Sequence, residues 1–103
     1  MNDNIKGIIN KYDELTLRME SPKLYSDMEQ YTKTVKELSE LEPLYKLCKQ
    51  IELTENNLTA ANELMSDPEF SELAKEETDL YKTELEALNN SLNELIKPND
   101  PDD

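Results

Sequence analysis

Residues 65–70 read MSDPEF, and this short stretch separates two long segments of helical periodicity. Asp67 suits a helix N-cap, Pro68 suits the first helical position, and Glu69 would lie near the positive end of that helix. A turn this short makes the two helices that it joins lie side by side. The stretch therefore predicts an antiparallel helical hairpin whose second helix begins at residue 68.

The segment after the turn, from 68 to about 97, carries an apolar stripe with spacings of three and four residues, which is typical of one helical face. The stripe weakens at Glu76, Glu77 and Thr78, where we expect the packing to be locally thin. The stripe consists of Phe70, Leu73, Leu80 or Tyr81, Leu85, Leu88, Leu92 and Leu95, with Ile96 beside it.

The segment before the turn, from about 26 to 66, is predicted to be one helix kinked near Pro43. A proline inside a helix removes a hydrogen bond and costs about 3 kcal/mol, but here the apolar spacing resumes at once and no Gly or Asn marks a turn. Ser26 and Glu29 form a possible capping box, although Pro22 could instead lie in the first turn. The stripe consists of Met28, Tyr31, Val35, Leu38, Leu41 or Leu44, Leu47, Ile51, Thr54, Leu58, Ala61 and Met65.

A third helix is predicted over residues 3–19. Asp3 is a possible cap, and Pro22 ends the helix because it disfavours helical geometry at the residue before it. Its stripe consists of Ile5, Ile8, Tyr12, Leu15 and Met19.

The single glycine in 103 residues disfavours folds that are rich in tight turns. We expect an all-α fold, an elongated antiparallel bundle or coiled-coil hairpin of three main helices. It would form one domain, 1–97, followed by an acidic linker with prolines, 98–103.

The chain has 24 acidic and 11 basic residues, for a net charge of −13. Binding to phosphate backbones requires clustered Lys and Arg, so the charge argues against nucleic acids and anionic membranes as partners. It permits a basic protein partner, or it serves only as a solvated surface. The N-terminus has no apolar stretch of signal-peptide length, and no run approaches a membrane span, so we expect a cytoplasmic location.

The side chains that usually carry catalysis are scarce in this chain. Histidine is absent, and Cys48 has no histidine or second cysteine to act with it, so we expect it in the core. The carboxylates of the last helix lack the glycine and the carbonyl ligands of a calcium loop. These features predict no enzyme, no cofactor and no metal site, and they favour a helical interaction module.

Three features together resemble a known family. They are the DPE helix start at Asp67–Glu69, the long Glu/Leu-rich helix after it, and the closing KPNDPDD at 97–103. The chain resembles the N-terminal domain of bacterial peptide chain release factor 1, a class I release factor. The DPDD ending favours release factor 1 over release factor 2, its paralogue.

The resemblance implies an accessory domain of a translation termination factor that directs stop-codon-dependent peptide release. It implies that the chain continues past Asp103 into a codon-reading body with a Gly-Gly-Gln tripeptide, because Gly7 is the only glycine here. It further implies the ribosome as partner, through a basic protein at the stalk base, and cooperation with the class II release-factor GTPase. We expect the contact at the turn of the hairpin, at Ser66, Asp67, Pro68 and Glu69.

An alternative is a free-standing acidic coiled coil that self-associates or acts as a scaffold. Heptad-like spacing at 44–65 and 81–95 permits it, whereas Thr54 and the proline breaks argue against a long parallel dimer.

Overall fold

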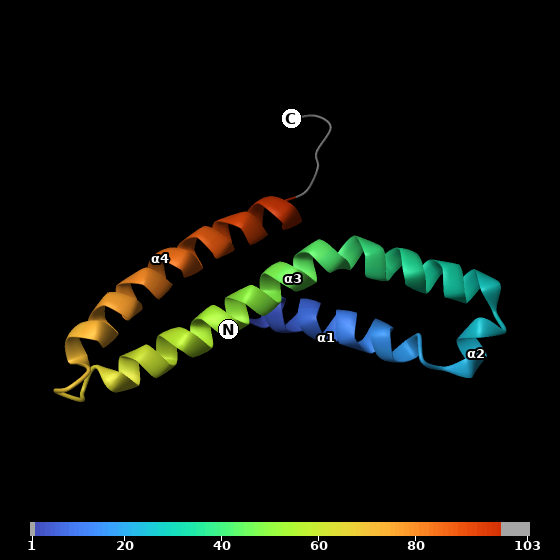
Figure 1. The fold of residues 1–103 in the computed structure, drawn as a ribbon. Helices are drawn as coiled ribbons and strands as arrows, with labels where there is room; N and C mark the ends of the chain where they lie inside the picture. Colours follow the sequence, from blue (N-terminus) through green and yellow to red (C-terminus); the bar gives the residue numbers. More distant parts are fainter. Residues whose placement is uncertain (1, 98–103) are drawn as a thin grey trace. The chain divides into compact units, whose positions relative to one another are not determined.

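The computed structural model describes residues 2–97, and the predicted linker at 98–103 lies outside the described residues. The described chain holds four helices and no strand: α1 (Asp3–Arg18), α2 (Pro22–Tyr25), α3 (Met28–Leu64) and α4 (Ser71–Ile96) (Figure 1). The all-α prediction is confirmed, and its three main helices correspond to α1, α3 and α4. The chain forms two compact units, Met1–Cys48 and Lys49–Asp103, whose boundary falls within α3.

The start of α1 differs from the sequence prediction by one residue. Asn2, not Asp3, is the N-cap: its backbone is extended and its side-chain oxygen accepts the Ile5 N–H at 2.9 Å. Asp3 is the first helical residue, where its negative charge still lies near the positive end of the helix. The prediction chose the wrong one of two adjacent residues that can both cap a helix.

The start of α3 also corrects a prediction, because the capping box between Ser26 and Glu29 does not form. The Ser26 hydroxyl donates to the Lys23 carbonyl at 2.7 Å, and the Asp27 carboxylate accepts the Gln30 N–H at 3.2 Å. Asp27 thus accepts the Gln30 N–H, whereas the predicted box would have paired Ser26 with the Glu29 N–H. Pro22, the alternative considered for a first turn, begins the separate short helix α2.

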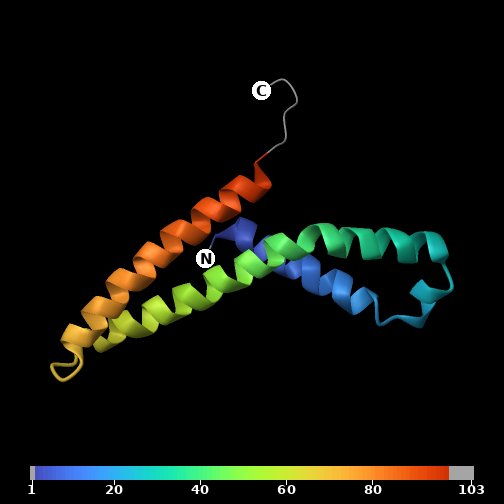
Figure 2. The same ribbon diagram turned by 45° about the horizontal axis from the view of Figure 1, so that its top comes forward.

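In the first unit, α1 runs beside the first part of α3, as the views in Figures 1 and 2 agree. The rings of Tyr12 and Tyr45 stack with centroids 4.0 Å apart and an interplanar angle of 15°. None of the residues of the predicted α1 stripe is exposed, and Ile9 is buried beside them. On α3, Thr34 is buried in place of its neighbour Val35. The buried side chains of this unit are Ile5, Ile9, Leu15, Leu24, Thr34 and Cys48.

Thr34 can lie in this core because its hydroxyl has a partner on its own helix. The Thr34 hydroxyl donates to the Gln30 carbonyl at 2.8 Å, so its burial leaves no unsatisfied donor. Met28 and Val35, which the predicted stripe placed in the core, are exposed.

Helix α3 passes through Pro43 without interruption over 37 residues, which confirms one helix instead of two. The kink near Pro43 stays a prediction.

In the second unit, α4 lies antiparallel to the last part of α3, and the turn joins them (Figures 1 and 2). The predicted hairpin is therefore confirmed. The expectation of thin packing around Thr78 is wrong, because Thr78 is only 3% exposed and its hydroxyl donates to the Met65 sulfur at 3.7 Å. The other buried side chains of the unit are Ile51, Thr54, Ala61, Ala74 and Leu92.

Replacing Gly7 with alanine is expected to stabilise the chain. Gly7 lies inside α1, where a Cβ atom would meet nothing within 4 Å, and alanine has the higher helix propensity. We expect an increase of about 0.5–1 kcal/mol in the free energy of unfolding, measured by urea titration with circular dichroism. Gly7→Pro is the opposing control, and it should unfold at a lower urea concentration than the parent chain. A Gly7→Ala chain that is no more stable would contradict the structure of α1.

The Cys48 thiol is expected to be unreactive in the folded chain. It is fully buried, and burial raises the pKa of the Cys48 thiol because the thiolate would lose its solvation. A maleimide probe at neutral pH should label the chain slowly in buffer and rapidly in concentrated urea, as followed by mass spectrometry. Equal labelling rates in the two conditions would show that Cys48 is accessible in the folded state.

Candidate functional site

The candidate site is the hairpin tip, which we define as residues 65–70. Two backbone hydrogen bonds close the turn: the Asp67 N–H donates to the Leu64 carbonyl and the Phe70 N–H to the Asp67 carbonyl, each at 3.0 Å. The Ser66 hydroxyl donates to the Glu63 carbonyl at 3.0 Å, which satisfies a carbonyl at the end of α3. The tip is therefore held by its own hydrogen bonds.

Asp67 does not have the role that its sequence context predicts. Helix α4 begins at Ser71 with Phe70 as its cap residue, so Asp67 is not the N-cap and Pro68 is not the first helical residue. The Asp67 carboxylate instead accepts the N–H of Glu69, two residues on, at 3.0 Å. Such a short-range bond is the Asx turn that aspartate favours, and it shapes the turn before the helix begins.

All four residues predicted for a partner contact lie within this turn. Ser66, Pro68 and Glu69 are exposed, and Asp67 is half-buried. The structure therefore brings them together on one short segment.

Sequence reasoning missed the apolar part of the tip. Met65 and Phe70, which the stripes assigned to the core, are 41% and 42% exposed. Both occupy the end of a stripe, beside a turn, where the opposite helix covers them only in part. That position in the sequence is the signal that could have identified them. The tip thus combines exposed apolar surface with the carboxylates of Asp67 and Glu69.

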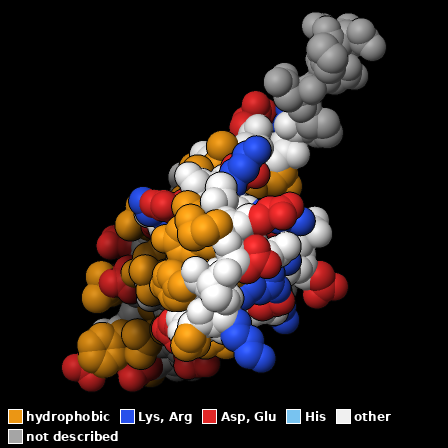
Figure 3. Space-filling model, turned by 90° about the vertical axis from the view of Figure 1, so that its right-hand side faces the viewer, with side chains coloured by type: hydrophobic (Ala, Val, Ile, Leu, Met, Phe, Trp, Pro, Cys, Tyr) orange, Lys and Arg blue, Asp and Glu red, His pale blue; other side chains and the backbone are white. Residues whose placement is uncertain are grey.

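The second unit also carries most of the negative charge. Residues 1–48 hold seven bases and nine acids, a net charge of −2, whereas residues 49–103 hold four bases and fifteen acids, a net charge of −11. Figure 3 shows hydrophobic side chains at the surface next to carboxylates on one face of the molecule. A basic partner would be attracted to the hairpin far more strongly than to the first unit.

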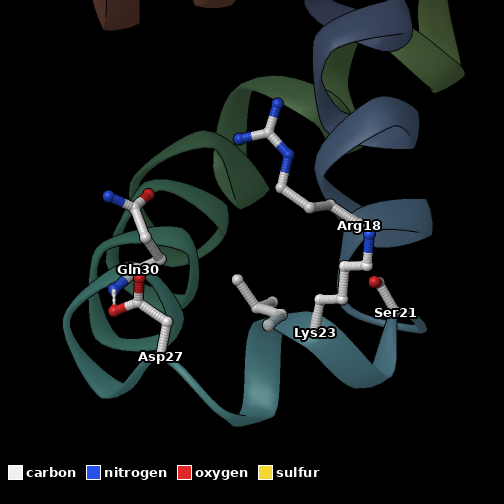
Figure 4. Close-up of a pocket in the computed structure, with 6 residues that line it drawn as sticks. Arg18, Ser21, Lys23, Asp27 and Gln30 are labelled. Atoms are coloured by element: carbon white, nitrogen blue, oxygen red, sulfur yellow. Dashed lines mark hydrogen bonds between the residues drawn. The ribbon is translucent and has the colours of Figure 1, made fainter.

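A surface pocket of about 340 Å³ lies in the first unit, where α1, α2 and α3 meet (Figure 4). Two of its charged groups have structural partners: Arg18 pairs with Glu14 at 3.3 Å, and Asp27 accepts the Gln30 N–H. The first contact lies within α1 and the second lies at the start of α3, and nothing in the pocket points to a ligand. The lining residues are Arg18, Ser21, Lys23, Leu24, Asp27 and Gln30.

Among residues 2–97, no group of three or more Cys, Asp or Glu side chains has the arrangement of a metal site. Within the same described range, no helix is long and apolar enough to span a membrane.

The PCRF domain model matches residues 8–103, nearly the whole chain. The chain belongs to the PCRF domain family. Among the curated proteins, it is 33% identical to peptide chain release factor 1 of Helicobacter pylori strain Shi470 over 101 residues, 98% of this chain and 29% of that protein. It is 33% identical to peptide chain release factor 1 of Alkaliphilus oremlandii over 107 residues, 100% of this chain and 30% of that protein.

Peptide chain release factor 1 of Campylobacter curvus is 31% identical over 98% of this chain and 28% of its own length. The resemblance of this PCRF domain to release factor 1 is therefore confirmed. The chain spans less than a third of the length of these relatives. No match was found among solved structures.

Asp67→Ala is expected to destabilise the PCRF domain through its tip. Alanine cannot accept the Glu69 N–H, so we expect a loss of about 0.5–1 kcal/mol in the free energy of unfolding, measured by urea titration. Asp67→Asn keeps the acceptor oxygen and is the matched control, which should lie within a few tenths of a kcal/mol of the parent chain. Equal losses in the two variants would show that this hydrogen bond does not hold the turn.

Proposed function

We propose that this PCRF domain is the accessory docking domain of a translation termination factor that acts on the ribosome in the cytoplasm. Within that factor it supplies no catalytic or codon-reading residue. Its hairpin tip contacts a basic protein at the base of the ribosomal stalk. Through that contact it supports cooperation with the class II release-factor GTPase, while the rest of the factor directs peptide release.

One observation carries the proposal: the PCRF match over residues 8–103, with curated relatives named peptide chain release factor 1 over nearly the same residues. Because the chain covers less than a third of those relatives, the chemistry of peptide release would belong to the remainder of such a protein.

The structure supports the tip as the contact. Ser66, Pro68 and Glu69 are exposed on a turn held by its own hydrogen bonds, so the loss of conformational entropy on binding is small. The exposed Met65 and Phe70 supply apolar surface of the kind that anchors protein interfaces. Asp67 and Glu69 would face the basic groups of the partner.

The charge distribution also bears on the self-associating coiled coil. Two copies that met through the second unit would bring together two segments, residues 49–103 of each copy, that each carry a net charge of −11. Such repulsion disfavours a parallel or antiparallel dimer at low ionic strength, whereas it favours a basic partner. Sedimentation at micromolar concentration distinguishes docking to a basic partner from self-association. Docking requires a monomer, and the coiled coil requires a stable dimer.

Charge reversal at the tip is expected to weaken binding to the large ribosomal subunit. The chain with Asp67→Lys and Glu69→Lys should bind purified large subunits at least about tenfold more weakly in co-sedimentation at low salt. Subunits stripped of the stalk-base protein should show a similar loss with the parent chain. Binding of the parent chain should also fall as salt rises, because exposed charges are screened.

The matched control is Glu86→Lys with Glu94→Lys, which makes the same change of charge on exposed positions of α4 away from the tip. Equal weakening by both pairs would show a general effect of charge on binding and would not locate the contact at the tip. In a longer factor that contains this domain, unchanged stalk-base binding and an unchanged termination rate with the tip pair would overturn the proposal.

A further inference from the structure

Five leucines are exposed on the hairpin of the second unit, Leu95 near the end of α4 and four others nearer the turn, although a soluble helix usually buries most of its leucines. Leu53 is 61% exposed and Leu64 is 44% exposed on α3, while Leu73 is 55% and Leu80 is 64% exposed on α4. We call these four residues the leucine face. Contiguous exposed apolar surface of this kind marks interaction sites more often than single exposed residues do.

The four leucines form two rows by the geometry of their helices. Leu73 and Leu80 are seven residues apart and Leu53 and Leu64 are eleven apart, and both intervals return to nearly the same side of an α-helix. Each pair therefore makes one row along its own helix.

The two rows lie on the same side of the hairpin. The face that α3 buries is marked by Ile51, Thr54 and Ala61, and the face that α4 buries is marked by Ala74, Thr78 and Leu92. Each leucine row is rotated in the same sense from the buried face of its own helix. Because the two helices are antiparallel, rotation in the same sense places both rows on one side of the pair.

The charges beside the leucine face on α4 are carboxylates. Exposed Glu76 lies three residues after Leu73, and exposed Glu84 lies four residues after Leu80. Lys75 and Lys82 each follow a leucine of the row by two residues, which turns them about 200° away from it.

On α3, Lys49 is the base nearest to Leu53, and it is held by Glu52 at 2.9 Å. A hollow of about 390 Å³ lies beside Leu53, lined also by Lys49, Gln50, Glu52 and Asn56. The hollow gives the row a place where a partner side chain can be anchored.

We propose that the leucine face binds a basic amphipathic helix of another protein, laid along the hairpin with its apolar side on the leucines and its Lys and Arg toward the flanking carboxylates. Recognition of this kind uses regularly spaced apolar anchors in an apolar groove. The charge complementarity favours this occupant over a second copy of the chain, because a second copy would add another net charge of −11. The surface is separate from residues 66–69, so the inference stands whether or not the tip binds the stalk base.

The test uses a fluorescent synthetic peptide of leucine and lysine, about 18 residues long, designed as an amphipathic helix. Fluorescence anisotropy against the 103-residue chain should give saturable binding. The double variant Leu53→Gln and Leu80→Gln should raise the dissociation constant about tenfold or more, since two apolar anchors are lost. Circular dichroism of the variant should match that of the parent chain, because both leucines are exposed.

Three controls separate this site from non-specific attraction to an acidic protein. Leu17→Gln removes an equally exposed leucine from α1 and should change the dissociation constant less than twofold. A peptide with the same composition but scrambled order should bind weakly, and the tip pair Asp67→Lys and Glu69→Lys should retain most of the affinity for the ordered peptide. Equal losses in Leu17→Gln and the double variant, or equal binding of both peptides, would overturn the proposal. A parent dimer that the double variant converts to a monomer would also overturn it, because the occupant would be a second copy.

Discussion

The turn at residues 65–70 is the constraint on which the second unit depends. It is short enough that α3 and α4 must run antiparallel and side by side, and its hydrogen bonds fix where each helix ends. The bond from the Thr78 hydroxyl to the Met65 sulfur ties the end of α3 to the second turn of α4. With the turn and this contact in place, the register of the hairpin follows, and so does the choice of residues that face the opposite helix.

The buried faces of the hairpin are built largely from small side chains. Thr54, Ala61, Ala74 and Thr78 are all buried, and side chains of this size allow helix axes to lie close together. Ile51 and Leu92 are buried beside them. The four leucines occupy positions that are rotated away from these buried faces, and this is the physical origin of the leucine face. An apolar surface is therefore a consequence of how the hairpin packs, and the flanking carboxylates on α4 disfavour its contact with a second copy of the same charge.

Much of the fold could be predicted from the sequence, because helix existence depends on spacing that the sequence displays directly. The three main helices, the break at 65–70 and the uninterrupted passage through Pro43 are all found. The caps were less predictable, since Asn2 and Asp3, or Ser26 and Asp27, are neighbours with similar capping ability. The exact face of α3 was missed by one residue at Thr34, because threonine gives no hydrophobic signal although its short side chain suits a close helix pair.

The candidate site, like the fold, could be predicted from the sequence only in part. The location of residues 66–69 at a turn could be predicted, because Pro68 and its neighbours interrupt the helical periodicity on both sides. The exposure of Met65, Phe70 and the four leucines could not be read from spacing, because an apolar residue near a stripe is assigned to the core by default. Only the opposite helix decides which of two adjacent apolar positions it covers. The net charge of −13 was visible from the start, but its concentration in residues 49–103 acquires meaning once the described part of that range forms a single hairpin. On α4, carboxylates lie beside the exposed leucine row, so a partner that brings basic and apolar side chains together gains from both.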